Sequence, residues 1–92
     1  MAKNVVIIEG EVFNEPSLRN TRSGVDVSNF LLQVVEEQNP PFEIHITAFG
    51  KVAVECATKF PRGSRVRVTG RLGKSQNTKE KEILVNDVVA VA

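Results

Sequence analysis

Tryptophan and tyrosine are absent from this 92-residue sequence, and cysteine and histidine occur once each. A single cysteine cannot form an internal disulfide bond, so we expect Cys56 to be a small buried apolar residue in a reducing compartment. His45 has no cysteine, aspartate or second histidine close to it in the sequence, which is poor support for a metal site. The sequence therefore predicts no metal and no cofactor.

Neither sign of charge dominates: 12 Lys and Arg residues stand against 11 Asp and Glu residues, a formal net charge of +1. The chain lacks the overall positive field of a polybasic protein, so any nucleic-acid binding depends on the local placement of charge. No apolar run approaches the roughly 20 residues that span a bilayer, and the amino terminus lacks a signal-peptide pattern. We expect a soluble, cytoplasmic protein without a membrane partner.

Catalytic patterns are also missing. The sequence has no nucleophile beside a base, no paired carboxylates in an apolar setting and no glycine-rich phosphate loop, so we predict that the protein is not an enzyme. Its length fits one domain over residues 1–92 with a thin core, which favours burial against another copy of the chain.

Alternating and β-branched residues dominate what is present. The patterns predict strands over residues 4–13, 25–35, 42–49, 64–72 and 83–92, and loops over residues 14–24, 36–41 and 73–82. Gly10 inside the first strand indicates a bend or a bulge. In the second strand the alternation changes phase between Val27 and Phe30, which predicts a bulge near Ser28.

Helical spacing appears once, at Val52, Ala53, Cys56 and Phe60, and Pro61 followed by Gly63 ends it after roughly ten residues. The resulting order, three strands, one short helix and two strands, is that of an OB-fold, a five-stranded Greek-key barrel. The sequence thus predicts an all-β protein whose helix lies between the third and fourth strands.

Exposed strand faces carry the candidate binding residues. In the third strand, His45 and Phe49 lie on the face opposite Ile44 and Ile46, so surface stacking is favoured for Phe49 over a core role or a subunit contact.

In the fourth strand, Val66, Val68 and Leu72 are expected to face inward and Arg65, Arg67 and Arg71 outward. Such a row of like charges suits phosphates, or carboxylates of another subunit. Further basic candidates are Lys51 and Arg62 beside the helix, Arg19 and Arg22 in the first loop, and Lys74, Lys79 and Lys81 in the last hairpin.

Three segments carry a resemblance to a known family: NVVIIEGEVFNEPSLRNTRSGVDVSNFLLQV, AFGKVAVECATKFPRGSRVRVTGRL and EILVNDVVAV. They resemble bacterial single-stranded-DNA-binding proteins over almost the whole chain. The first segment is in step with the family at Asn4, Gly10, Pro16, Arg19, Gly24, Val27 and Asn29. The resemblance implies an OB-fold that wraps single-stranded DNA, usually as a homotetramer, in DNA replication, repair and recombination.

Departures from the family pattern predict a minimal or specialised relative. The family stacks bases on aromatic residues at three further places, where a collinear alignment puts Gln38, Glu43 and Asn77, with Phe42 one residue away. Only Phe49 stands at a stacking position, so binding is expected to depend on phosphate contacts. The loop over residues 36–41 is short, and the sequence ends without the flexible linker and acidic tip through which the family recruits partners.

Four consecutive apolar residues, Val5 to Ile8, make both faces of the first strand hydrophobic, although a barrel wall buries only one. We expect Val5 and Ile7 to contact a second copy, in a dimer or a tetramer.

Two functions remain open. The favoured one is binding of single-stranded DNA without strong sequence preference through Phe49 and the basic residues. The alternative is an OB-fold subunit, like a primosomal protein, that contacts other replication or recombination proteins and binds nucleic acid weakly or not at all.

Overall fold

A computed structural model describes residues 3–75 and 80–91 of the chain. Its elements are β1 (Val6–Val12), β2 (Arg19–Asn20), β3 (Asp26–Glu36), β4 (Asn39–Phe49), α1 (Lys51–Lys59), β5 (Arg65–Lys74) and β6 (Lys81–Ala90). The predicted order of three strands, a helix and two strands is confirmed. The difference is β2, a two-residue strand in a segment predicted to be a loop, which forms because Arg19 and Asn20 pair with the start of β3.

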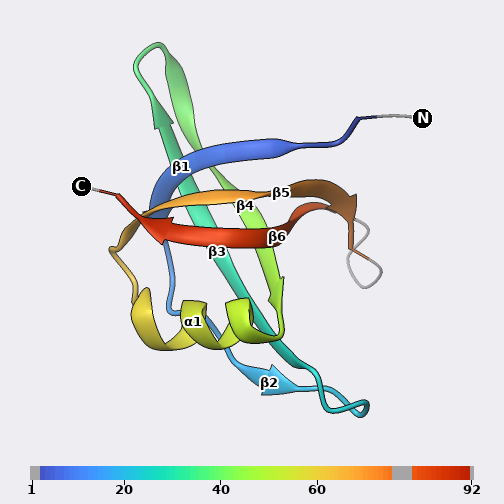
Figure 1. The fold of residues 1–92 in the computed structure, drawn as a ribbon. Coiled ribbons are helices and arrows are strands. Elements are labelled where there is room, and N and C mark those ends of the chain that lie inside the picture. Colours follow the sequence, from blue (N-terminus) through green and yellow to red (C-terminus); the bar gives the residue numbers. More distant parts are fainter. Residues whose placement is uncertain (1–2, 76–79, 92) are drawn as a thin grey trace.

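The strands form one sheet in the order β1-β5-β6-β4-β3-β2, and additional pairing between β1 and β3 closes it into a barrel. β4 and β6 run parallel, and the other pairings are antiparallel. Figure 1 shows α1 across one end of the barrel and the β3–β4 hairpin projecting beyond the other end. The five long strands are therefore a closed wall whose outer surface is available for binding.

Gly10 permits the barrel to close. Around this residue β1 changes partners, since residues 6–11 pair with β5 and residues 11–12 pair with β3. A side chain at Gly10 would collide with the backbone carbonyl of Gln33. The predicted bend at Gly10 thus has a steric reason, the close approach of two strands.

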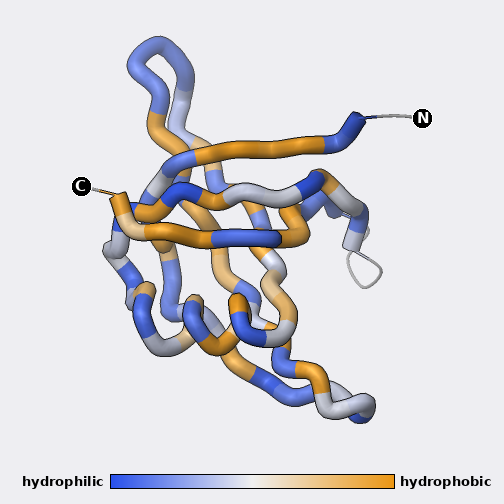
Figure 2. The backbone as a smooth tube through the Cα atoms, in the orientation of Figure 1, coloured by the Kyte–Doolittle hydropathy of each residue, from blue (hydrophilic) through white to orange (hydrophobic). Residues whose placement is uncertain are grey.

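The core lies inside this barrel, under α1. Ala53, Cys56 and Phe60 project from the helix region into a cluster with buried residues of every long strand. Burial alternates along β3 and β5, as expected for a wall with one buried and one exposed face, whereas β1 is apolar over a continuous stretch in Figure 2. The predicted helix with its apolar stripe is confirmed.

The bulge predicted near Ser28 is wrong. β3 pairs with β4 in an uninterrupted register from Val27 to Val34, and the one irregularity lies between Val34 and Glu36. The alternation changes phase because Ser28 takes a core-facing position, where it is fully buried, while Val27 is buried on the outer face. A polar residue on the inner face next to an apolar residue on the outer face changes the phase of the hydrophobic pattern as a bulge would, although the strand pairing is regular.

The loop predicted over residues 36–41 is also wrong. Only Glu37 and Gln38 form the turn, and β4 already begins at Asn39. Pro40 and Pro41 lie opposite the irregularity in β3, beyond the segment of β4 that pairs with β6. Among the described residues no second strand pairs with them there, so their missing N–H groups are tolerated at this strand end.

The β5–β6 hairpin is longer than predicted, because Gly73 pairs with Glu82 and Lys74 pairs with Lys81 within the segment expected to be a loop. Leu72, predicted to face inward, is exposed. Leu72 pairs with Ile83 of β6, but the pairing of β1 with β5 ends at Gly70, so on that side the Asn4 side chain, and not a strand, bonds the Leu72 backbone.

Candidate nucleic-acid interface

Three connected hollows form a groove on the outer face of β3, β4 and the β5–β6 hairpin. The largest, about 410 Å³, and a second of about 210 Å³ share the residues Arg19, Asn29, Thr47, Ser75 and Glu82. A third, about 280 Å³, meets the second at Asn29 and His45. We call these connected hollows the groove.

The groove floor includes the outward side chains of β4. Ile46 and Ala48 point into the core, so His45, Thr47 and Phe49 point outward by strand alternation. Phe49 lines the largest hollow and is 49% exposed. Gly50 then turns the chain into α1 with a φ of 66° and donates its N–H to the Asp26 carbonyl at 2.9 Å. The last residue of β4 therefore presents an aromatic ring to the groove.

Basic side chains surround this ring. Arg19 is held opposite Val27 by the short β2–β3 pairing and lines both larger hollows. Lys74 lines the largest hollow and Lys81 the second, from the two strands of the hairpin. None of these three cations forms an ion pair with a carboxylate in the described part of the chain. Arg22 lies on the exposed turn between β2 and β3 and lines none of the three hollows.

A hydrogen-bond network crosses the floor between the cations. Asn29 donates from Nδ2 to Thr47 Oγ1 at 2.9 Å, and Thr47 donates its hydroxyl to Glu82 Oε1 at 2.5 Å. Thr47 is only 6% exposed. The network joins β3, β4 and β6 and holds a carboxylate at the junction of the two larger hollows.

His45 lies at the junction of the two smaller hollows. Its Nε2 is 3.0 Å from Glu80 Oε2, and both side chains are more than half exposed. This carboxylate, like Glu82, adds negative charge near the cations of the groove.

The predicted arginine row on β5 does not gather in the groove. Arg67 pairs with Glu9 of β1, with Nε 2.8 Å from Oε2, and Arg65 lies opposite Glu11. Arg71 lies opposite Leu84, a groove residue, and directly paired residues project from the same side of a sheet. The row is exposed as predicted, but its first two members face carboxylates of the same chain.

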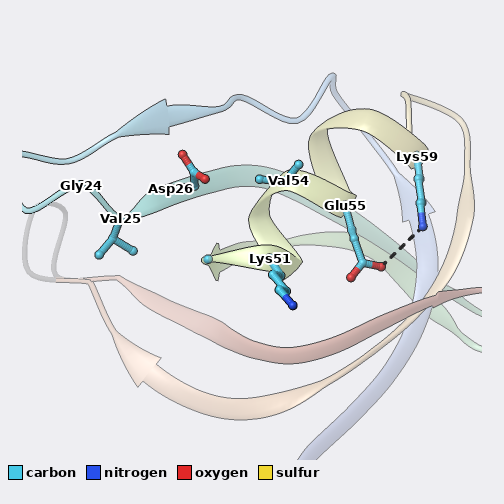
Figure 3. Close-up of a pocket in the computed structure, with 8 residues that line it drawn as sticks. Gly24, Val25, Asp26, Lys51, Val54, Glu55 and Lys59 are labelled. Atoms are coloured by element: carbon cyan, nitrogen blue, oxygen red, sulfur yellow. Dashed lines mark ion pairs between the residues drawn. The ribbon is translucent and has the colours of Figure 1, made fainter.

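The helix-flanking candidates also lie elsewhere. Lys51 lines a separate hollow of about 630 Å³ between α1 and the β2–β3 turn, where Figure 3 shows it with Val25, Asp26 and Glu55. Lys59, which lines the same hollow, is ion-paired with Glu55 at 4.0 Å. Arg62 follows α1 and donates its backbone N–H to Glu15 at 3.2 Å. Neither Lys51 nor Arg62 lines the groove.

The outer face of β1 and the segment before it expose Val5 and Ile7, which are 62% and 65% exposed. The neighbouring outward residue of β1, Glu9, is the partner of Arg67. An apolar strip bordered by an ion pair thus lies on the side of the barrel formed by β1 and β5.

Cys56 is buried and has no disulfide partner, as predicted. Burial, reinforced by the neighbouring Glu55 carboxylate, raises the pKa of its thiol to about 11. The thiolate is therefore scarce at neutral pH, and the thiol acts as a core side chain. Within residues 3–75 and 80–91, no cluster of three potential metal ligands is found, and no helix is long and apolar enough to cross a membrane.

The sequence alone does not mark Asn29, Thr47 and Glu82 as site residues, although all three line the groove. The alternation of β4 places Thr47 on the same outer face as His45 and Phe49, so the sequence pattern is sufficient to predict its position. Glu82 joins them only through the parallel pairing of β4 with β6. Of the collinear stacking positions, Gln38 lies in the β3–β4 turn and Glu43 is exposed opposite Gln33, while Asn77 lies outside the described residues.

The fold is shared with solved structures of low sequence identity. The SSB domain of a Synechococcus sp. protein superposes with a TM-score of 0.84 at 23% identity, covering 96% of both chains. The single-stranded DNA binding protein from Thermus aquaticus gives a TM-score of 0.86 at 22% identity, covering 98% of this chain and 41% of that one. These likenesses confirm the predicted OB-fold.

Sequence relatives are closer in identity. The "Single-stranded DNA-binding protein 1" of Staphylococcus aureus strain MSSA476 is 35% identical over 97 residues, covering 95% of this chain and 61% of that protein. The "Single-stranded DNA-binding protein" of Aquifex aeolicus is 36% identical over 87 residues, covering 86% of this chain and 58% of that protein. The chain thus spans about three fifths of the length of these relatives.

The family model described as "Single-strand binding protein family" matches residues 3–91, which contain the whole barrel, the helix and the groove. With relatives above 30% identity along nearly all of the chain, the match confirms the resemblance seen in the sequence. The chain belongs to the single-strand binding protein family.

Proposed function

We propose that this protein binds single-stranded DNA in the groove and is a binding protein, not an enzyme. The observation that carries the proposal is one hollow in which Phe49 lies with Arg19 and Lys74. An aromatic ring can stack a base of any identity, and unpaired cations beside it attract the phosphates. The names of the sequence relatives support the same activity. In a bacterial cell such a protein works in the cytoplasm.

Binding is divided between two kinds of contact in this proposal. Phe49 supplies the stacking platform, and Arg19, Lys74, Lys81 and Arg71 supply phosphate contacts from strands around it. Lys51, Arg62 and Arg65 lie outside the groove, so they contribute only if the DNA continues beyond it. His45 lies at the far end of the groove, where its Nε2 is 3.0 Å from the Glu80 carboxylate.

Titration of fluorescent dT and rU oligonucleotides of several lengths, at low and moderate salt, tests the proposal. We expect saturable binding to dT that weakens as salt rises, because released counterions contribute to the affinity. Comparison with rU measures the preference between DNA and RNA. Absence of binding to every oligonucleotide at low salt contradicts the proposal.

One observation favours the alternative, a protein-interaction subunit with weak nucleic-acid binding. Carboxylates lie in or beside the groove at Glu82 and Glu80, and the chain has only one stacking platform at the expected positions. If oligonucleotides do not bind, this function replaces the first.

We also propose that the protein self-associates through the exposed strip of Val5 and Ile7. Two copies of the strip, related by a two-fold axis, would remove four aliphatic side chains from water per dimer. Light scattering at tens of micromolar protein tests this, and a strictly monomeric mass contradicts it.

A further inference from the structure

Glu82 is an unusual residue for a groove that attracts phosphates. Its carboxylate lies where the two larger hollows meet, beside Arg19 and close to the hairpin lysines. Yet no cation in the described part of the chain lies within ion-pair distance of it. Neutralising a neighbouring cation therefore does not explain why it is there.

The carboxylate is instead held in a defined position. Oε1 accepts the hydroxyl of the almost fully buried Thr47, which in turn accepts a hydrogen bond from Asn29. Oε2 has no hydrogen bond to any of the described residues. One oxygen is thus fixed to the floor, and the other remains available as an acceptor on a residue that lines both larger hollows.

A fixed carboxylate repels phosphates and accepts hydrogen bonds from donors. Phe49 lines the same hollow, so a base that stacks on the ring lies in the space that Glu82 borders. The DNA group that meets Glu82 without repulsion is therefore a base edge that carries an N–H donor.

We propose that Glu82 is a base-selecting residue that accepts a hydrogen bond from an exocyclic amino group and favours cytosine over thymine. Cytosine presents the N4 amino donor, which carboxylates accept, whereas thymine presents the O4 carbonyl at the corresponding position. Thymine also has an N3–H donor, but it lies between the O2 and O4 carbonyls, so a carboxylate that accepts from it faces a carbonyl oxygen on each side, whereas the cytosine amino group offers two N–H donors. The inference rests on the proposed function, because it requires a DNA strand in the groove.

Paired titrations of equal-length dC and dT oligonucleotides at pH 7.5 test the inference. For the unaltered protein we expect dC to bind about fivefold more tightly than dT, the effect of one discriminating hydrogen bond. For Glu82→Gln we expect both affinities to rise and the ratio of dC to dT to fall by about fivefold. The Gln amide, free to rotate, can accept from cytosine or donate to thymine.

Two further variants separate position from charge. Thr47→Val keeps the shape of the side chain but removes the hydroxyl that holds Oε1, so the dC to dT ratio should fall although Glu82 keeps its charge. Glu43→Gln is the matched control: it removes one exposed carboxylate from β4 that lines none of the three hollows. It should leave the ratio unchanged. Circular dichroism and a thermal melt establish that each variant is folded.

The outcomes distinguish this inference from the proposed function. If neither oligonucleotide binds the unaltered protein, both ideas fail. If both bind with equal affinity, the proposed function stands and base selection fails. If dC is preferred and Glu82→Gln keeps the same ratio while strengthening both affinities, Glu82 acts only through its charge, and the inference is overturned.

Discussion

Two faces of the barrel, the groove and the β1–β5 face, both expose cations beside apolar side chains, but the cations differ in their partners. In the groove, Arg19 and Lys74 have no ion-pair partner within the described residues. On the β1–β5 face, Arg67 is paired with Glu9, and Arg65 lies opposite Glu11. A cation that already pairs with a carboxylate on the neighbouring strand gains less binding free energy from a phosphate. The residue across the strand therefore determines whether a cation is available to bind DNA.

The apolar residues of the two faces differ as well. The groove presents the flat ring of Phe49, which can stack on a base, whereas the β1 side presents the aliphatic Val5 and Ile7, which suit burial against protein. The comparison predicts that one face binds DNA and the other binds a second copy. Four sets of variants can break or sharpen it.

The largest effect is expected from Ile7→Glu, which places a charge in the middle of the proposed subunit contact. We expect the dissociation constant of the assembly to rise at least about 100-fold, because each copy would bury an unpaired carboxylate. Sedimentation or light scattering measures this. Val35→Glu is the control, since it adds the same charge to the exposed β3–β4 hairpin. If both variants assemble like the unaltered protein, the contact lies elsewhere.

Phe49→Ala should weaken DNA binding by about 1–3 kcal/mol, the contribution of one stacked base. The slope of log affinity against log salt should stay nearly the same, because no charge is removed. Phe13→Ala is the matched control, as Phe13 is similarly exposed but lines no hollow of the groove. Equal losses in the two variants would contradict the role of Phe49.

Arg19→Gln and Lys74→Gln should each flatten the salt slope by about 0.7, the value for one neutralised phosphate on a single strand. Arg65→Gln and Arg67→Gln, which remove charge from the other face, should leave the slope unchanged. Fluorescence titrations over a range of salt concentrations measure all four. A flatter slope in the second pair alone would show that DNA follows β5 and not the groove.

The smallest effect is expected from Glu9→Gln, which breaks the pair with Arg67. Both side chains are about half exposed, at 48% and 49%, so solvent screens the pair. We expect the free energy of unfolding to fall by less than about 1 kcal/mol. The variant also frees Arg67, so DNA affinity at low salt should rise slightly if a strand can reach this face. Urea denaturation and the titration measure the two effects.

The sequence predicted the fold in most respects, because strand alternation and the stripe of α1 depend on neighbouring residues. The predicted elements were wrong where a polar residue lies on the buried face of a strand or an apolar residue lies on its exposed face. Ser28 inside the barrel and Val27 outside it imitated a bulge, and the adjacent prolines imitated a loop. In the site, the sequence predicted that Phe49 and His45 lie on the exposed face, because both positions follow from the alternation within one strand.

The sequence by itself determined the two faces of β4, the bend at Gly10, the apolar surplus of β1 and the membership of the family. Only the tertiary structure decided which outward residues meet. The pairing of β1 with β5 brings Glu9 to Arg67, and the parallel pairing of β4 with β6 brings Glu82 to Thr47. Such pairings join residues 35 and 58 positions apart, and local periodicity carries no information about contacts over that separation.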